Sequence, residues 1–143
     1  MITCTRRIQF CAGHRVFGHE GKCRNIHGHN YVAFITAQAD QLDAVGRVID
    51  FSVLKDRIGG WIDREWDHGC ILWENDTDAR MAVESCRPAK VFTLPTNPTA
   101  ENMADYLLRV VCPKELAGTG VRVVSVRVWE TENCYAEAVE CIG

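Results

Sequence analysis

Two histidines flank a single glycine in the stretch Lys22-Cys23-Arg24-Asn25-Ile26-His27-Gly28-His29-Asn30. In an extended strand the side chains point alternately to opposite faces, so His27 and His29 would project from the same face. His14 lies a short loop upstream and can supply a third imidazole. Three protein ligands with a fourth position open to water or substrate are typical of catalytic zinc sites, whereas structural sites usually take four ligands. The stretch therefore predicts a catalytic Zn²⁺ site.

The alternative is that these histidines are ordinary hydrogen-bonded groups inside the fold, because His-x-His also occurs by chance. The distribution of histidine favours the metal site, since four of the five histidines of the chain lie within residues 14–29. His19 belongs to this window, but it sits in the glycine-flanked segment Gly18-His19-Glu20-Gly21. Such a segment is typical of an exposed loop, so we expect His19 to lie outside the ligand set.

Length and composition favour an ordinary globular enzyme or binding protein. The 143 residues suit one domain, 1–143, and the hydrophobic fraction of 47% with 24% charged residues excludes a disordered chain. A net charge of −3 gives no general attraction to nucleic acid or to an anionic membrane. No apolar run has the length of a transmembrane helix, and the N-terminal cations are not followed by the apolar stretch of a secretory signal. We therefore expect a cytoplasmic location.

The eight cysteines do not form a Cys-x-x-Cys pair that would indicate a thiolate zinc site or a redox dithiol. In a reducing compartment most of them are expected to serve as small core hydrophobes. Cys23 is different because Lys22 and Arg24 flank it, and neighbouring cations favour the reactive thiolate form. Cys23 is therefore a candidate catalytic residue.

The apolar pattern changes its period along the chain in the order strand, strand, helix, helix, strand, strand. Runs rich in β-branched and aromatic residues predict strands at 6–10, 31–36, 121–130 and 134–139. Apolar side chains at three- and four-residue steps predict two helices, one with Ser52 as its N-cap and one that Thr99 caps and Pro113 stops. The stretch 74–95 is expected to be a long loop with some local structure.

Six motifs extend this pattern over nearly the whole chain. They are, in order, Phe10-x-Ala12-Gly13-His14, Cys23-Arg24-Asn25-Ile26-His27-Gly28-His29-Asn30-Tyr31, Val48-Ile49-Asp50-Phe51, Asp67-His68, Pro98-Thr99-Ala100-Glu101-Asn102 and Glu130-Thr131. Their order and spacing resemble the signature of the 6-pyruvoyl-tetrahydropterin synthase and 6-carboxy-tetrahydropterin synthase family. The resemblance implies an α+β tunnelling fold (T-fold), in which an antiparallel four-stranded sheet carries two helices on one face. It also implies a homo-oligomeric barrel, usually a hexamer made of two trimers, with active sites between subunits.

The resemblance also implies a role for each matching residue. By this match the zinc ligands are His14, His27 and His29, the catalytic residues are Cys23, Asp67 and His68, and the pterin anchor is Glu130. Without the resemblance, His68 would be interpreted as a histidine that the helix dipole stabilises, and Glu130 as a solvated strand end. Trp73 departs from the family pattern, which often has asparagine there, and the 74–95 stretch has no counterpart in it.

The substrate that the resemblance implies is 7,8-dihydroneopterin triphosphate, on which zinc acts as a Lewis acid. Cys23 as thiolate would remove a proton from the side chain of the substrate, and His68, oriented by Asp67, would act as general acid or base. Cations for the triphosphate are available nearby in the sequence at Arg15, Lys22 and Arg24.

Two products are possible within the family. One is 6-carboxy-5,6,7,8-tetrahydropterin, formed with release of acetaldehyde on the way to queuosine, and the other is the 6-pyruvoyl product of the tetrahydrobiopterin pathway. The Cys-x-x-x-His-x-His spacing resembles the former type more closely. A hypothesis of another class is a zinc-stabilised pterin-binding or scaffold protein that has lost catalysis.

Overall fold

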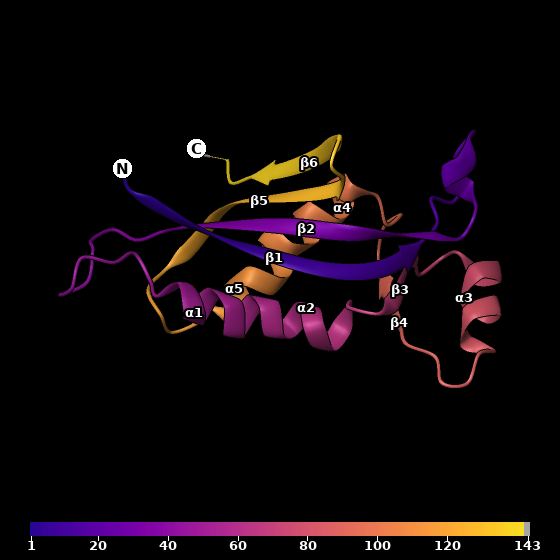
Figure 1. The fold of residues 1–143 in the computed structure, drawn as a ribbon, viewed down its shortest axis with the longest axis horizontal. Coiled ribbons are helices and arrows are strands. Elements are labelled where there is room, and N and C mark those ends of the chain that lie inside the picture. The colour runs from indigo at the N-terminus through magenta and orange to yellow at the C-terminus, as the bar shows by residue number, and fades with distance from the viewer. Residues whose placement is uncertain (142–143) are drawn as a thin grey trace.

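The computed structural model describes residues 1–141, and a six-stranded sheet of order β4-β3-β1-β2-β5-β6 forms its central layer (Figure 1). The strands are β1 (Thr3–His14), β2 (His27–Gln38), β3 (Gly69–Trp73), β4 (Val91–Leu94), β5 (Arg122–Thr131) and β6 (Cys134–Val139). The pairs β1–β2, β2–β5 and β5–β6 are antiparallel, whereas β1–β3 and β3–β4 are parallel. The mixed α+β class predicted from the sequence is confirmed.

The expectation of a four-stranded sheet is wrong, because β3 and β4 extend the sheet beyond β1. These strands have five and four residues, which is too short for a period-two pattern to be distinguished from a loop. The segment between them forms the helix α3 (Thr77–Glu84), whose first turn is capped by Asp76. Figure 1 shows α3 and the loop between β1 and β2 at the same end of the sheet, opposite the chain termini.

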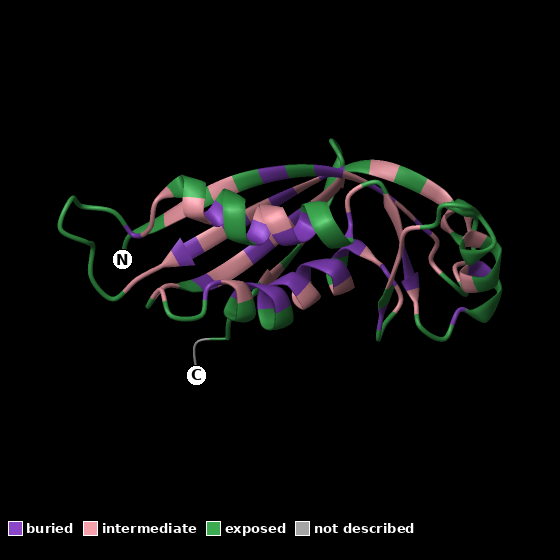
Figure 2. Ribbon diagram, turned by 90° about the horizontal axis from the view of Figure 1, so that it is seen from below, coloured by how far each residue is buried: buried purple, intermediate pink, exposed green. Residues whose placement is uncertain are grey.

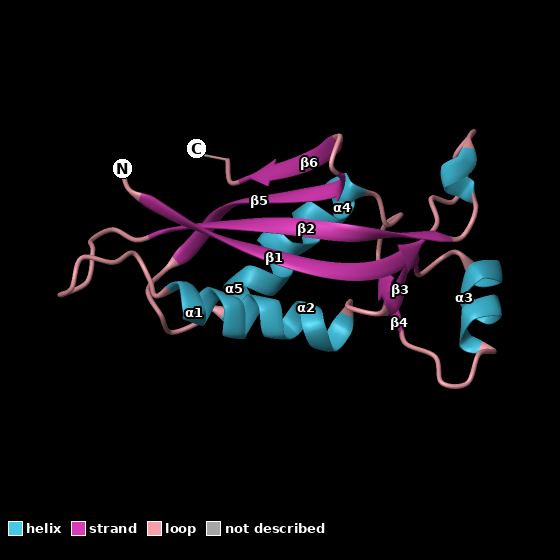
Figure 3. Cartoon of the chain, in the orientation of Figure 1, coloured by secondary structure: helices cyan, strands magenta, loops and turns pink. Residues whose placement is uncertain are grey.

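Two continuous helical rods pack against one face of the sheet (Figure 3). The first consists of α1 (Phe51–Leu54), the π-helical turn η2 (Lys55–Gly59) and α2 (Gly60–Glu65), and the second of α4 (Ala100–Tyr106), the π-helical turn η3 (Leu107–Val111) and α5 (Cys112–Glu115). The prediction of Thr99 as a cap is confirmed by the hydrogen bond that its hydroxyl accepts from the Asn102 N–H. The prediction that Pro113 stops the helix is wrong, because the rod continues through Pro113 to the end of α5 at Glu115.

The first helix begins two residues earlier than predicted. Asp50, not Ser52, is the N-cap, and its carboxylate accepts hydrogen bonds from both the N–H and the hydroxyl of Ser52. Aspartate and serine are about equally good caps, so the sequence pattern does not choose between two candidates this close together.

The core lies between the helices and the inner face of the sheet, where the buried positions in Figure 2 face one another. Trp66 is fully buried and packs against Phe10, which in turn stacks on Tyr31 across the β1–β2 ladder. The next positions of the same register toward the loop pair Ala12 with His29 and His14 with His27. Along β1 and β2, every second side chain points into the core. The three predicted ligands continue this series and therefore lie at the edge of the core.

The outer face of the sheet is not covered by these helical rods. A groove of about 930 Å³ lies along it, and Arg7, Phe34, Arg127 and Trp129 contribute to its lining. Among residues 1–141, none of the helices has the length and apolar character that crossing a membrane requires.

Candidate metal centre and active site

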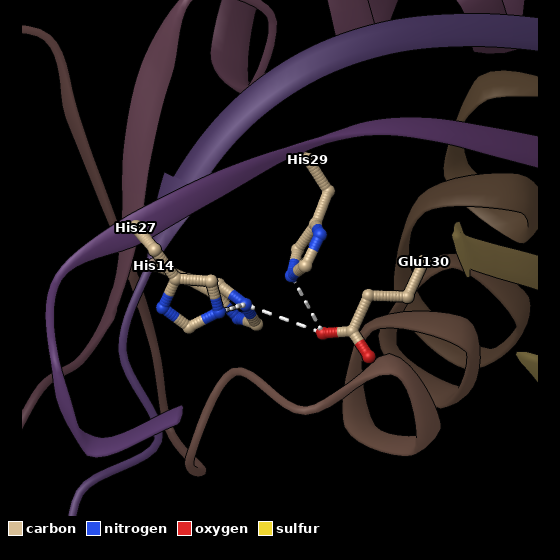
Figure 4. A group of neighbouring side chains, drawn as sticks. All are labelled: His14, His27, His29 and Glu130. Atoms are coloured by element: carbon tan, nitrogen blue, oxygen red, sulfur yellow. Dashed lines mark hydrogen bonds and ion pairs between the residues drawn. The ribbon is translucent and has the colours of Figure 1, made fainter. Parts of the chain in front are cut away.

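Three imidazoles converge at the loop end of the β1–β2 ladder, and the carboxylate of Glu130 joins them from the end of β5 (Figure 4). The Nε2 atoms of His14 and His27 are 3.2 Å apart. Glu130 Oε1 lies 3.3 Å from His14 Nε2 and 3.2 Å from His29 Nε2. One ligand atom from each of the four residues lies within 4.8 Å of the others, so these residues form a group that could hold a metal ion.

Main-chain carbonyl groups set the orientation of two of the rings. His14 Nδ1 donates to the Pro98 carbonyl at 2.7 Å, and His27 Nδ1 donates to the Asn25 carbonyl at the same distance. A proton held on Nδ1 leaves the lone pair of Nε2 free for a metal, which is the arrangement that most metal-binding histidines adopt. Pro98 is placed there because it directly precedes Thr99, the cap of α4.

His29 provides a direct test of whether these residues suit a metal. Its Nε2 is buried and, among the residues that the structure describes, has no hydrogen-bond partner, although Glu130 lies nearby. Burial lowers the pKa of His29, and the attraction of Glu130 offsets this only in part, so the neutral, metal-binding form is favoured. A buried nitrogen without a partner, aimed at two other Nε2 atoms, fits an ion such as zinc.

Glu130 contacts His14 and His29 directly. Its predicted role as pterin anchor did not require such contacts. The nearby His14 imidazole is the main cause that lowers the pKa of Glu130, against the opposing effect of burial, and this holds the side chain as a carboxylate. Sequence reasoning missed this proximity to the ligands. The sequence does show Glu130 at the end of a predicted strand. Only the pairing of β5 with β2 reveals that this end lies beside the histidines.

Cys23 lies in the 3-10 turn η1 (Lys22–Arg24), inside the loop between β1 and β2, and is half-buried. Its thiol is not part of the four-residue group. Its carbonyl accepts a hydrogen bond from the Val16 N–H at 2.8 Å. The adjacent Phe17 is held at both its N–H and its carbonyl by the side-chain amide of Asn97. The loop that carries Cys23 is thus fastened to the turn before α4, a role of Asn97 that sequence reasoning missed.

Asp67 and His68 form a hydrogen-bonded pair in the turn between α2 and β3. Asp67 accepts from His68 Nδ1 at 2.7 Å and from the Cys11 N–H at 2.9 Å. Burial raises the pKa of Asp67, but these two hydrogen bonds more than offset burial, so the pKa is lowered overall. The His68 side chain is 77% exposed and borders a groove of about 520 Å³, which Cys11, Asn30 and His29 also line.

The structure therefore brings His14, His27 and His29 together and leaves Asp67 and His68 outside their group. Cys11 and Asn30 contact each other as cross-strand partners. Alternation along β1 and β2 directs their side chains to the sheet face opposite the three ligands. Within one chain, His68 thus lies outside the group of predicted zinc ligands, although His29 lines the groove that His68 borders.

Comparisons with known proteins give a consistent result. The family described as 6-pyruvoyl tetrahydropterin synthase matches residues 3–141. A protein of Rickettsia felis named 6-carboxy-5,6,7,8-tetrahydropterin synthase is 43% identical over 137 residues, which cover 96% of this chain and 99% of the relative. A protein of the same name from Aquifex aeolicus is 32% identical over 158 residues, with coverage of 95% and 96%.

Solved structures share the fold. An uncharacterized protein from Wolinella succinogenes superposes with a TM-score of 0.85 at 22% identity, covering 98% of both chains. The 6-pyruvoyl tetrahydropterin synthase of Caenorhabditis elegans superposes with a TM-score of 0.71 at 24% identity, covering 98% of this chain and 96% of that one. At such identities the likeness concerns the fold alone.

Proposed function

Because the chain belongs to the 6-pyruvoyl tetrahydropterin synthase family and is a lyase-type enzyme, we propose that it forms 6-carboxy-5,6,7,8-tetrahydropterin from 7,8-dihydroneopterin triphosphate and water. Triphosphate and acetaldehyde are the other products. The observation that carries the proposal is the convergence of three imidazole Nε2 atoms, one of them buried without a hydrogen-bond partner among the described residues. Relatives at 43% and 44% identity bear the name of this activity.

The proposed zinc ligands are His14, His27 and His29. When bound there, zinc would supply Lewis acidity toward a side-chain hydroxyl of the substrate and so acidify the neighbouring C–H bond. The Cys23 thiolate takes up that proton. The imidazole of His68 transfers protons at the substrate side chain, and the Asp67 carboxylate keeps its Nδ1 protonated and its Nε2 directed outward.

Glu130 is proposed to fix the pterin ring. A carboxylate can accept two parallel hydrogen bonds, one from the amino group and one from the ring N–H of a pterin, which sets both position and orientation. The lowered pKa of Glu130 keeps it in the accepting form. Its Oε1 lies 3.2 Å from His29 Nε2, which supports a pterin anchor close to the proposed metal ligands, as a reaction on the side chain attached to the ring requires.

The separation of His68 from the metal ligands supports a homo-oligomer, proposed as a hexamer of two trimers, with active sites completed between subunits. His68 is largely exposed in the single chain and is not part of the group formed by His14, His27, His29 and Glu130, although His29 lines the same groove. Among residues 1–141, the edge strands β4 and β6 of the sheet each pair with a neighbouring strand on one side only. Unpaired strand edges can extend a sheet from one subunit into the next.

Of the cations near Cys23 in the sequence, Arg15 is already engaged by Asp76. Lys22 and Arg24 therefore remain the proposed contacts for the triphosphate. Both flank Cys23 in η1, where their charges lie close to the thiol along the chain.

A second candidate is the 6-pyruvoyl product, since the family and the fold include synthases of that name. The deciding experiment incubates the zinc-loaded protein with 7,8-dihydroneopterin triphosphate and identifies the products by mass. A carboxypterin with acetaldehyde supports the proposal, and a pyruvoyl product selects the second candidate. Absence of triphosphate release would favour an inactive pterin-binding or scaffold protein.

A further inference from the structure

Lys90 contacts the turn that carries His68 from both sides. Its Nζ donates hydrogen bonds to the main-chain carbonyls of Asp63 and Asp67, at 3.0 and 2.5 Å. Both of these residues precede His68 in the sequence. Its own main-chain carbonyl accepts from the Cys70 N–H at 2.9 Å, after His68. Lys90 directly precedes β4. A residue distant in sequence therefore binds the Asp67–His68 turn at main-chain groups before and after His68.

The turn needs such support because His68 adopts a positive φ of 61°. This left-handed conformation is unfavourable for residues with a Cβ atom, and it persists only where surrounding contacts impose it. The His68 N–H donates to the Cys11 carbonyl at 2.7 Å, which anchors the turn to β1. Lys90 provides the anchor on the opposite side, toward α2 and β4.

Gly69 allows Lys90 to approach this closely. A Cβ atom at Gly69 would lie 3.0 Å from Lys90 Cγ and 3.1 Å from its carbonyl oxygen, so a larger residue would push Lys90 away. The lysine stem therefore lies close to Gly69, and its ammonium group reaches the Asp63 carbonyl in the last turn of α2 and the Asp67 carbonyl in the turn that follows. A cation at a helix C-terminus is also favoured by the helix dipole.

The charge of Lys90 acts on Asp67 as well. Burial raises the pKa of Asp67, whereas the Cys11 and His68 hydrogen bonds and the nearby Lys90 ammonium lower it. An ionised Asp67 is the form that accepts the hydrogen bond from His68 Nδ1. The position and the charge of Lys90 thus both favour the orientation of the His68 imidazole in which Nδ1 donates to Asp67.

We propose that Lys90 is a positioning residue that holds the Asp67–His68 turn in its left-handed conformation and thereby presents His68 for proton transfer. The inference rests on the proposed role of His68. Lys90 belongs to the 74–95 stretch that the family motifs did not cover, so this support for the pair comes from a part of the chain that carries none of the predicted site residues.

The test uses Lys90→Met, which keeps the apolar stem over Gly69 but removes the ammonium, and Lys90→Arg, which restores a cationic donor. Lys114→Met, at an exposed lysine in α5, is the matched control. We expect Lys90→Met to keep its zinc content and KM while kcat falls about tenfold or more, since small displacements of a catalytic group have effects of this size. Lys90→Arg should recover most of kcat, and Lys114→Met should equal the unsubstituted protein.

A second readout does not depend on activity. Hydrogen–deuterium exchange of the peptide that spans residues 66–70 should become faster in Lys90→Met and stay unchanged in Lys114→Met. Unchanged exchange, or unchanged kcat, in Lys90→Met would overturn the inference. Should Lys90→Met fail to fold, Lys90→Gln is measured by the same two criteria. If the unsubstituted protein does not turn over the pterin triphosphate, the proposed function fails, while the exchange data still decide whether Lys90 holds the turn.

Discussion

Arg15 donates two hydrogen bonds to Asp76, from Nε to Oδ2 at 2.6 Å and from Nη2 to Oδ1 at 2.5 Å. Asp76 is 1% exposed and also caps α3. Arg15, which follows the proposed ligand His14, is therefore bound to the helix α3 between β3 and β4. This pair links the proposed metal centre to a part of the fold that the sequence pattern did not reveal.

Replacing Arg15 by Met should destabilise the protein strongly. The substitution leaves the buried Asp76 carboxylate without its cation, and breaking a buried pair in this way costs about 3 to 5 kcal/mol. Urea denaturation measures the loss in the free energy of unfolding. Arg109→Met removes an exposed pair with Asp105 and should cost at most about 1 kcal/mol. Equal effects of the two substitutions would contradict the structure.

The contribution of the Arg15–Asp76 pair should disappear in acid. The hydrogen bond from Arg15 is the main cause that lowers the pKa of Asp76 in the folded protein, against a smaller opposing effect of burial. A lowered folded-state pKa gives stability that is present above the unfolded pKa of about 3.9 and lost as the pH falls through the folded value. The difference in unfolding free energy between the unsubstituted protein and Arg15→Met should therefore shrink as the pH falls below about 4. A difference that grows in acid would show the opposite linkage.

Zinc should stabilise the folded protein through His14. Free zinc at a hundredfold excess over its Kd adds about 2.7 kcal/mol to the free energy of unfolding when only the folded state binds it. His14→Ala should lose most of the resulting rise in melting temperature, measured by thermal unfolding with and without zinc. His19→Ala is the control, because His19 accepts a hydrogen bond from Gly21 in the loop and is not part of the four-residue group. Equal zinc responses of the two variants would argue against the site.

Glu130→Gln separates the two tasks that the position of Glu130 allows. If Glu130 anchors the pterin, zinc content stays unchanged while kcat/KM falls about tenfold to a hundredfold, because charge-assisted hydrogen bonds to the ring are lost. If Glu130 is chiefly a fourth ligand, zinc content falls instead. Metal analysis and steady-state kinetics on the same preparations distinguish the two, with Glu115→Gln in α5 as the control. We expect the first result.

Cys23→Ala and His68→Ala should each keep zinc and lose product formation. If the active site is completed between subunits, unfolding the two inactive variants together and refolding the mixture should restore part of the activity, since some sites then combine an intact Cys23 with an intact His68. Refolding each variant alone is the control. A mixture as inactive as its components would show that both residues must come from one chain.

The parts of the fold with a clear sequence period were predicted, and the parts built from short segments or main-chain groups were not. The alternation that places His27 and His29 on one face of β2 was visible in the sequence, and so was the hydroxyl cap at Thr99. The strands β3 and β4 were too short to show a period. The carbonyl of Pro98, which orients His14, has no side-chain signature at all.

Tertiary pairing explains the remaining differences at the site. The approach of Glu130 to His29 requires β5 to lie beside β2, and these strands are separated by more than eighty residues of chain. The amide of Asn97 binds Phe17 across a similar distance. Such contacts follow from the assembled sheet and not from local sequence, so only the resemblance to a family could anticipate any of them.

The antiparallel ladder of β1 and β2 ends with the pair His14 and His27, so two proposed ligands flank the intervening segment of residues 15–26. Within it, Arg15 binds Asp76 and the Asn25 carbonyl orients His27, whereas residues 18–20 make neither contact. Sequence changes confined to 18–20 can therefore vary this loop while Arg15, Cys23 and Asn25 are kept, which makes its tip a point for redesigning selectivity.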